Sequence, residues 1–263
     1  MSAIGVFDSG VGGLTVAREI IRQLPNENII YFGDTARVPY GIKSPQTVIR
    51  FSIENILFLL KHDVKLICVA CNTASSFALP VIRNNFRVPI IGVITPGARE
   101  AVYASQNKRI GVIGTKGTIK SRTYEIEIKQ LDSKVKVTAV ACPLFVPFVE
   151  EGWLSGEVVS SVAKQYLKPL KDAGVDTVIL GCTHYPLLKP VIQDVLGKKV
   201  ILIDSAKQVA FEIKKILASE DLLNRCKGGK HKFFVSDNPE WFSSLAQRFM
   251  GKKLMNVRKA DNV

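Results

Sequence analysis

Two cysteines in this chain stand in similar surroundings that are typical of proton-transfer chemistry. Cys71 closes the apolar run in "VACNTAS", and Cys182 closes another in "ILGCTHYP". A thiol between a strand and a helix faces free backbone N–H groups, which stabilise a thiolate, so we expect the pKa of both thiols to fall toward working pH. Each cysteine is followed at once by polar residues, namely Asn72 and Thr73 after the first and Thr183 and His184 after the second.

Two thiols that face one substrate from opposite sides form a proton donor and a proton acceptor. One removes a proton from a carbon atom, and the other returns a proton to the opposite face. Inversion at a carbon α to a carboxylate requires such a pair. The alternative is that Cys71 and Cys182 are small buried apolar side chains. The polar donors beside them favour the catalytic hypothesis.

The other cysteines are expected to have no role in catalysis. Cys68 and Cys71 form a C-x-x-C motif, which leaves redox chemistry or a zinc site with Cys182 and His184 as alternatives. Residues three apart on a strand point to opposite faces, so Cys68 is predicted to lie in the core. The Cys-x-His spacing is not a usual zinc pattern, so we expect no metal. Cys142 is predicted to be a packing residue and Cys226 a surface thiol.

The glycine-rich stretch "GVFDSGVGG" leaves a dinucleotide site as another alternative, with Asp34 as the ribose-binding acid. The G-x-G-x-x-G motif is incomplete, however, because Thr15 occupies the third glycine position. A carboxylate at Asp8 would also repel a pyrophosphate. We therefore expect the turn to present its N–H groups to a small anion while Asp8 acts on a neighbouring proton.

Strands and helices alternate along the chain, which predicts parallel sheets with helices on both faces. We expect a helix over 44–63, with Ser44 as its N-cap and Pro45 in its first turn. Strands are predicted at 3–7, 28–32, 64–70, 89–93, 109–115, 134–140, 176–180, 199–204 and 231–236. The other helices are predicted at 13–24, from about 74, at 117–131, in two stretches up to about 173, after 182, from about 206 and after 238.

The second half of this series resembles the first. "IGVFDSGVGG" at 4–13 matches "IGVIGTKGTI" at 110–119, and the two cysteine segments follow in the same order. This echo predicts two similar doubly wound parallel-sheet domains, related by a pseudo-twofold axis, with the active site in the cleft between them. We expect the first domain to comprise 1–94 plus 207–263 and the second 95–206, with the C-terminal segment packed on the first.

Composition sets broad limits on function. The chain has 263 residues, of which 47% are hydrophobic and 22% charged, as in ordinary globular proteins. No signal-peptide pattern or long apolar run is present, and the cysteines are interpreted as free thiols, so we expect a cytoplasmic protein without a membrane partner. The net charge of +13 leaves a nucleic-acid-binding or protein-binding role as an alternative. Because the basic residues are interspersed with acids, no nucleic-acid partner is expected.

Five blocks of the sequence together resemble the cofactor-independent Asp/Glu racemase family, and glutamate racemases within it. The blocks are "FDSGVGGLTV", "YFGDTARVPYG", "VACNTAS", "PLFVPFVEEG" and "LGCTHYPLL", and they span about the first 205 residues. The resemblance implies an enzyme that interconverts L- and D-glutamate by two-base proton transfer, without pyridoxal phosphate or any other cofactor. It also implies a role in supplying D-glutamate for peptidoglycan.

The resemblance assigns roles to individual residues. Cys71 is expected to take the proton from the D-enantiomer with the help of Asp8, and Cys182 from the L-enantiomer with the help of His184. Glu150 matches a further acidic residue of the family, with Glu151 as the alternative. The substrate-binding positions implied are Asp8, Ser9, Pro39, Tyr40, Gly41, Asn72, Thr73, Thr115, Thr118, Thr183 and His184.

The alternative within the enzyme class is an aspartate racemase or another racemase of the same family. Both amino acids present the same α-carbon to the thiols, so the motifs do not separate them. We expect a small-molecule substrate and a homodimer.

Overall fold

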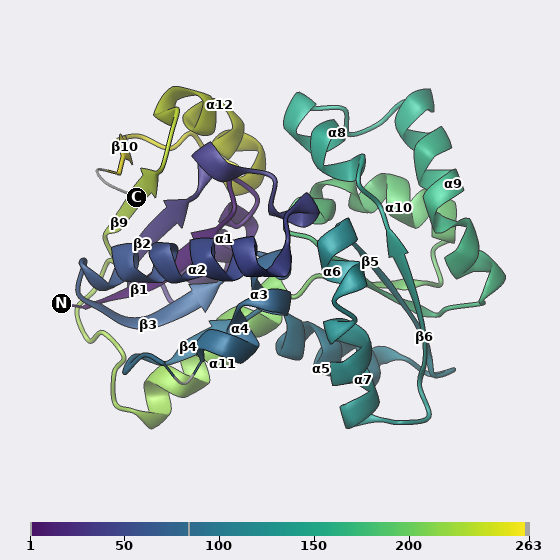
Figure 1. The fold of residues 1–263 in the computed structure, drawn as a ribbon, viewed down its shortest axis with the longest axis horizontal. Helices are drawn as coiled ribbons and strands as arrows, with labels where there is room; N and C mark the ends of the chain where they lie inside the picture. The colour runs from purple at the N-terminus through teal and green to yellow at the C-terminus, as the bar shows by residue number, and fades with distance from the viewer. Residues whose placement is uncertain (1, 84, 261–263) are drawn as a thin grey trace.

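Two parallel β-sheets form the framework of the chain in this computed structural model, which describes residues 2–83 and 85–260. Each sheet is the centre of one lobe (Figure 1). The first sheet has the order β10-β9-β2-β1-β3-β4, and the second has the order β6-β5-β7-β8. The strands of the first are β1 (Ala3–Asp8), β2 (Asn28–Gly33), β3 (Val64–Val69), β4 (Ile90–Gly92), β9 (His231–Val235) and β10 (Val257–Lys259). Those of the second are β5 (Arg109–Gly114), β6 (Lys136–Ala141), β7 (Thr177–Gly181) and β8 (Ile201–Ile203).

The two sheets share a topology. The order β2-β1-β3-β4 in the first sheet corresponds strand for strand to β6-β5-β7-β8 in the second. The strand before each cysteine, β3 or β7, is therefore in the same place in its own sheet. This confirms the predicted pair of similar parallel-sheet units, while the exact domain boundaries stay a prediction.

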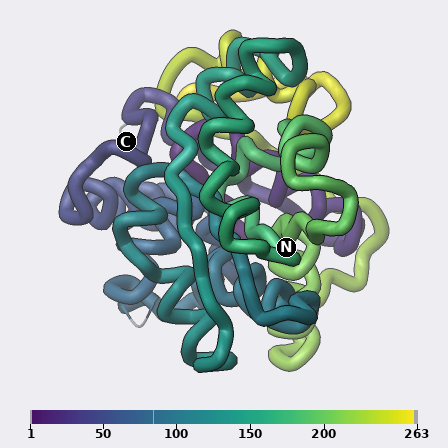
Figure 2. The backbone as a smooth tube through the Cα atoms, turned by 90° about the vertical axis from the view of Figure 1, so that its right-hand side faces the viewer, coloured from purple at the N-terminus to yellow at the C-terminus, as the bar shows by residue number. Residues whose placement is uncertain are grey.

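Helices cover both faces of the sheets and connect one strand to the next along the chain. Figure 2 views the molecule from the side of the second lobe. In this view the C-terminal segment, in yellow, lies along the upper end of the molecule. The helices are α1 (Leu14–Gln23), α2 (Pro45–Leu60), α3 (Asn72–Phe77), α4 (Leu79–Ile82), α5 (Ile94–Ala104), α6 (Lys116–Lys120), α7 (Thr123–Leu131), α8 (Phe145–Glu151), α9 (Glu157–Asp172), α10 (Lys189–Leu196), α11 (Ala206–Ser219) and α12 (Pro239–Met250). None of the helices in the described ranges is long and apolar enough to cross a bilayer.

The strand β1 shows how the sequence builds two packed faces. Successive side chains of a strand point to opposite sides, so Ile4 and Val6 lie in one apolar cluster and Ala3 and Phe7 in another. The first cluster continues into the second lobe through residues such as Tyr185. The lobes are thus joined by shared packing as well as by the chain.

Local signals set the start of α2 as predicted. The Ser44 side chain accepts a hydrogen bond from the backbone N–H of Thr47, at 3.3 Å, and Pro45 follows in the first turn. A hydroxyl N-cap satisfies one of the N–H groups that a helix start leaves free. Proline costs little there because its missing N–H has no helical partner.

Two predicted helices differ from the structure, and two further elements, the helix α5 and the strand β10, were not predicted. The helix expected over 117–131 is two helices, because Arg122 has a left-handed backbone with φ of 56° and separates α6 from α7. The helix expected after Cys182 begins as a 3-10 turn, Tyr185–Leu188, before α10. The short strand β10 extends the sheet through β9, which pairs in parallel with β2.

Candidate functional site

A pocket of about 210 Å³ lies between the carboxyl ends of strands from both sheets. Ligands bind at such ends in open α/β sheets because helix N-termini and loops converge there. Two predicted site residues, Asp8 and Thr118, lie outside the lining and contact it from behind. The predicted residues that line it are Ser9, Pro39, Tyr40, Gly41, Cys71, Asn72, Thr73, Thr115, Glu150, Cys182, Thr183 and His184.

Cys71 stands between β3 and α3, at the N-cap of the helix. Its Sγ accepts a hydrogen bond from the Ala74 N–H at 3.5 Å and lies 3.6 Å from the Ser9 hydroxyl, to which the thiol donates. Only 5% of the residue is exposed. The thiol therefore reaches the pocket from an otherwise buried position.

The predicted fall in the Cys71 pKa is wrong for this structure. Burial, which disfavours the thiolate, and the nearby charge of Asp8 together raise the pKa to about 12. The Ala74 N–H and the Ser9 hydroxyl can both donate to the thiolate form and so act in the opposite direction, but they are outweighed. Cys71 is consequently a thiol at neutral pH.

Cys182 lies beside His184, which in turn contacts Glu150. Its Sγ lies 3.9 Å from His184 Nδ1, and His184 Nε2 lies 2.9 Å from Glu150 Oε1. Burial lowers the pKa of His184, but the contacts with Cys182 and Glu150 more than compensate and raise it to about 10. The imidazole is therefore protonated at neutral pH and places positive charge beside Cys182.

Asp8 lies behind the pocket at the end of β1 and is completely buried. Its carboxylate accepts hydrogen bonds from the Gly10 N–H, at 3.0 Å, and from the Thr183 hydroxyl, at 3.5 Å. Burial raises its pKa, while the charge of His184 opposes that rise. Asp8 thus acts on Cys71 by its charge, and the hydrogen bond to that thiol involves Ser9 instead.

Three threonine hydroxyls meet on one side of the pocket. Thr73 Oγ1 lies 2.9 Å from Thr115 Oγ1 and 3.2 Å from Thr118 Oγ1. Thr73 belongs to α3 of the first lobe, whereas the other two belong to the start of α6 in the second. The lobes therefore contribute hydroxyl donors to the same place. The neighbouring amide of Asn72 is fixed by the Tyr124 hydroxyl, which donates to it at 2.7 Å.

The hydroxyl of Tyr40 is occupied by hydrogen bonds inside the protein and is not free for a substrate. It bonds to Asp34 and accepts a hydrogen bond from Asn55 Nδ2 at 3.1 Å. Asp34 is completely buried and also binds Arg37 and Ser236. Because these groups occupy it, Asp34 is not placed as a ribose-binding acid. The network instead holds the segment that carries Pro39 and Gly41 at the pocket.

Gly12 allows the glycine-rich turn to pass close to the second thiol. A Cβ at this position would lie 2.3 Å from Thr183 Oγ1 and 2.4 Å from His184 Nδ1. Such separations are far inside van der Waals contact, so a side chain here would force Thr183 and His184 to shift. The glycine is needed for this close approach and not for a dinucleotide.

Several pocket residues were not predicted from the sequence. Lys116 is the one that brings a charge, at the start of α6. Its place in "IGTKGT", the echo of the first glycine-rich turn, was the available signal. The other unpredicted lining residues are Gly10, Val38, Ile42, Pro143, Val146 and Pro147.

The remaining cysteines lie where the sequence analysis predicted them, and the other two histidines lie outside the pocket. Cys68 and Cys142 are buried and Cys226 is exposed. His62 packs against Phe58 and Phe234, and His231 opens β9. Within the described ranges, no three Cys, His, Asp or Glu side chains come together in an arrangement suited to a metal ion.

Comparisons with known proteins agree with this geometry. The family model for Asp/Glu/Hydantoin racemase matches residues 4–211. A glutamate racemase of Geobacter metallireducens is 53% identical over 97% of this chain and 95% of its own length. The crystal structure of a glutamate racemase from Bacillus anthracis is 44% identical, with a TM-score of 0.95 over 99% of this chain and 97% of the other.

A second solved structure was determined with a ligand. The glutamate racemase from Francisella tularensis, in complex with D-glutamate, is 39% identical to this chain and has a TM-score of 0.93. It covers 99% of this chain, and 97% of its own chain is matched. On the family match, the fold and these relatives, the chain belongs to the Asp/Glu/hydantoin racemase family.

Proposed function

We propose that this protein is a glutamate racemase that interconverts L- and D-glutamate with two cysteine thiols. The observation that carries the proposal is that Cys71 and Cys182, from equivalent strands of the two sheets, line one pocket. The names of the relatives supply the substrate. Proton removal and proton return then take place on opposite faces of one α-carbon.

Each direction of the reaction uses the thiols in opposite roles. From D-glutamate, the Cys71 thiolate takes the α-proton and the Cys182 thiol returns one to the other face. From L-glutamate, the Cys182 thiolate takes the proton and the Cys71 thiol returns one. The electron pair of the broken C–H bond stays on the α-carbon until the new C–H bond forms. The pair of sulfur atoms therefore holds one proton before and after each turnover.

The charges around each thiol suit these roles. Protonated His184 places a positive charge beside Cys182, the sulfur that we assign as the base for L-glutamate, and the raised pKa of Cys71 keeps that residue a proton donor. This state is ready for L-glutamate. For D-glutamate the single proton must lie on Cys182 instead of Cys71. His184 is the neighbouring group that can protonate Cys182, and we assign Asp8, the carboxylate near Cys71, to take the proton that Cys71 loses.

The α-proton of an amino acid is very weakly acidic, so the site must stabilise the carbanionic intermediate. Fixed donors aimed at the developing charge do this without reorganisation. The hydroxyls of Thr73, Thr115 and Thr118 and the amide of Asn72 are held in place by hydrogen bonds with their neighbours. We assign them, with Ser9 and Thr183, to the carboxylates and the amino group of the substrate.

The biological setting belongs to the same proposal. We infer a homodimer in the cytoplasm that supplies D-glutamate for peptidoglycan. The five cysteines are free, as expected for a reducing compartment.

Proton exchange in deuterated water tests the proposed function. Purified protein without added cofactor is given L-glutamate or L-aspartate, and α-deuterium incorporation and optical rotation are followed. Incorporation and loss of rotation with glutamate support the proposal. Turnover of aspartate alone would identify an aspartate racemase. Inactivity with both amino acids, together with salt-sensitive DNA binding, would refute the proposal and favour a nucleic-acid-binding role.

A further inference from the structure

The C-terminal helix α12 contacts the part of the second lobe that carries Glu150. Arg248 of α12 donates from Nη1 to the backbone carbonyl of Val149, at 3.4 Å, and to that of Glu150. In Figure 1, α12 and α8 stand opposite each other at the same end of the two lobes. A segment with no recognisable motif therefore touches the backbone that positions a site residue.

The contact is built to hold the end of α8. The last carbonyls of a helix have no helical partner and carry partial negative charge, which a guanidinium neutralises. Gly152 ends α8 with a φ of 80°, and a Cβ there would lie 2.8 Å from Arg248 Nη2. The glycine thus serves both the helix end and the approach of Arg248.

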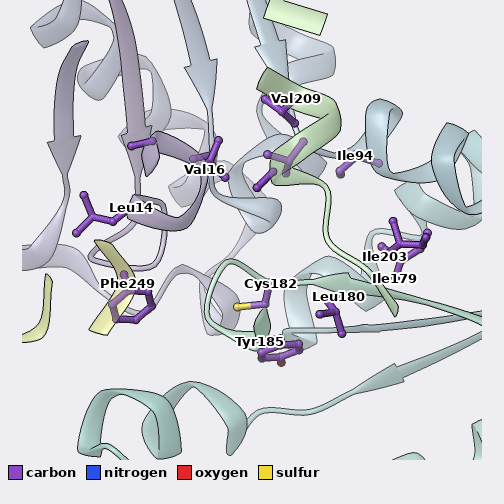
Figure 3. Close-up of a cluster of buried hydrophobic side chains, with 14 of the residues drawn as sticks. Leu14, Val16, Ile94, Ile179, Leu180, Cys182, Tyr185, Ile203, Val209 and Phe249 are labelled. Carbon is purple, nitrogen blue, oxygen red and sulfur yellow. The ribbon is translucent and has the colours of Figure 1, made fainter. Parts of the chain in front are cut away.

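The next residue of α12 contacts the imidazole itself. The ring of Phe249 is completely buried, and its centroid lies 5.4 Å from that of His184 with the planes at 82°. Phe249 shares an apolar cluster with Cys182, Leu14 and Tyr185 (Figure 3). Gly12 lies against the atom Nδ1 of His184. The imidazole is therefore held by Phe249, Gly12 and Glu150 as well as by its thiol.

We propose that Arg248 and Phe249 are positioning residues that hold Glu150 and His184 in line with Cys182. Arg248 fixes the backbone of Glu150, and Phe249 fixes the plane of the His184 ring. Neither residue lines the pocket itself. Their effect falls on the thiol of the second lobe, because Cys71 depends on Ser9, Asp8 and Ala74 instead.

The inference rests on the proposed function for its kinetic part and on geometry alone for the rest. The variants are Arg248→Met, which keeps the length of the side chain, Arg248→Lys, which restores a cation, and Phe249→Leu. Gln247→Met is the matched control, since Gln247 is exposed on the same helix and faces a depression lined by Lys253 and Val257. Phe249 is in the core, so Phe249→Leu could fail to fold. In that case the result for Arg248→Met alone tests the proposal.

The first readout needs no activity. The chain has three histidines, so the His184 resonances can be assigned by comparison with His184→Gln and titrated by NMR. Arg248→Met should lower the pKa of His184 from about 10 toward 6.5, because the contact with Glu150 loosens. Arg248→Lys should restore part of it, and Gln247→Met should leave it unchanged. An unchanged titration in Arg248→Met overturns the proposal even if glutamate is not the substrate.

The second readout compares the two faces of the reaction. Arg248→Met should lower kcat by about tenfold to a hundredfold, as small misplacements of catalytic groups do. The primary isotope effect should rise with α-deuterated L-glutamate and fall with the D-enantiomer, because the step at Cys182 becomes slower. Equal changes for both enantiomers would mean a structural role only. Inactivity of the unaltered protein would instead refute the proposed function.

Discussion

The hydroxyl oxygens of Thr73 and Thr115 lie 2.9 Å apart, although they belong to different lobes. Each residue stands where a helix follows a strand, and the two helix starts meet on one side of the pocket. A ligand held by both hydroxyls would draw the lobes together. Substrate binding is thereby linked to the arrangement of the two thiols.

Replacing Thr73 by valine should weaken the binding of both enantiomers. The change keeps the shape of the side chain but removes a donor to a charged group, which is worth about 1.5–3 kcal/mol. KM for L- and D-glutamate should rise by about tenfold to a hundredfold. Thr123→Val, which removes a hydroxyl bonded to Ser76 and Ser121, should leave KM unchanged. Equal KM values in Thr73→Val and the unaltered protein would exclude this role.

Alanine at either thiol should abolish racemisation. Cys71→Ala and Cys182→Ala each remove one member of the donor and acceptor pair, so turnover should fall by at least about a thousandfold, the scale of acid–base catalysis. Circular dichroism follows the loss of optical activity. Cys226→Ala at the surface and Cys68→Ala in the core serve as controls that keep turnover. Near-normal turnover in either active-site variant would disprove the two-base assignment.

The stabilising effect of His184 should depend on pH in a defined window. Its pKa is raised from 6.5 to about 10 in the folded protein, so its contribution is fully present below about pH 6.5 and is lost as the pH rises through 10. The difference in unfolding free energy between the unaltered protein and His184→Gln should shrink over that range. Urea titrations at several pH values measure it.

His62 provides the control for this titration. Burial lowers its pKa, so its pH-dependent effect lies below 6.5. His62→Gln should therefore show a constant difference at higher pH. A constant difference for His184→Gln as well would contradict the raised pKa.

Gly12→Ala should impair catalysis without unfolding the protein. The new Cβ would lie 2.4 Å from His184 Nδ1, so the imidazole must shift away from Cys182. We expect kcat to fall by about a hundredfold, as measured by steady-state kinetics. Gly97→Ala in α5, where the added Cβ would meet Ser205 at 3.1 Å, should retain its activity. Full activity of Gly12→Ala would show that the ring position is not critical.

Lys65→Met should destabilise the first lobe. Lys65 Nζ lies 2.6 Å from Glu27 Oε2, and both side chains are buried. Lys65 also donates a hydrogen bond to Asn224 Oδ1, in the segment between α11 and β9. Removing one member leaves a buried charge without its partner, which costs about 3–5 kcal/mol in urea unfolding. The double variant with Glu27→Gln should recover part of the loss.

An exposed ion pair is the matched control for Lys65. Lys168 and Asp172 lie 2.5 Å apart, with 72% and 61% of their side chains exposed. Lys168→Met should cost less than about 1 kcal/mol, because solvent screens such pairs. Similar losses in Lys65→Met and Lys168→Met would mean that burial does not matter here.

The sequence predicted what is encoded locally. The start of α2 follows from Ser44 and Pro45, whose effects act within one helical turn. The pocket residues beside Cys71 and Cys182 follow from their position after apolar strands. The break at Arg122 was not predicted, because no glycine or proline stands next to this left-handed residue to mark the end of a helix.

Contacts between distant residues could not be predicted. His184 and Glu150 are 34 positions apart, and Arg248 and Glu150 are 98 apart. The first contact depends on how α8 packs within the second lobe, and the second contact depends on how α12 packs against that lobe. The pKa of Cys71 was mispredicted for a similar reason, because a helix start favours the thiolate while burial, which only the fold determines, outweighs it.

The matching places of β3 and β7 in their sheets bear on how configuration is inverted. One four-stranded unit carries one thiol and so reaches one face of a carbon atom. Such a unit alone can exchange a proton with solvent but always returns it to the side from which it came. Inversion of configuration arises only when a second unit faces the first. Under the proposed mechanism, the repeat of one unit is what supplies the second thiol.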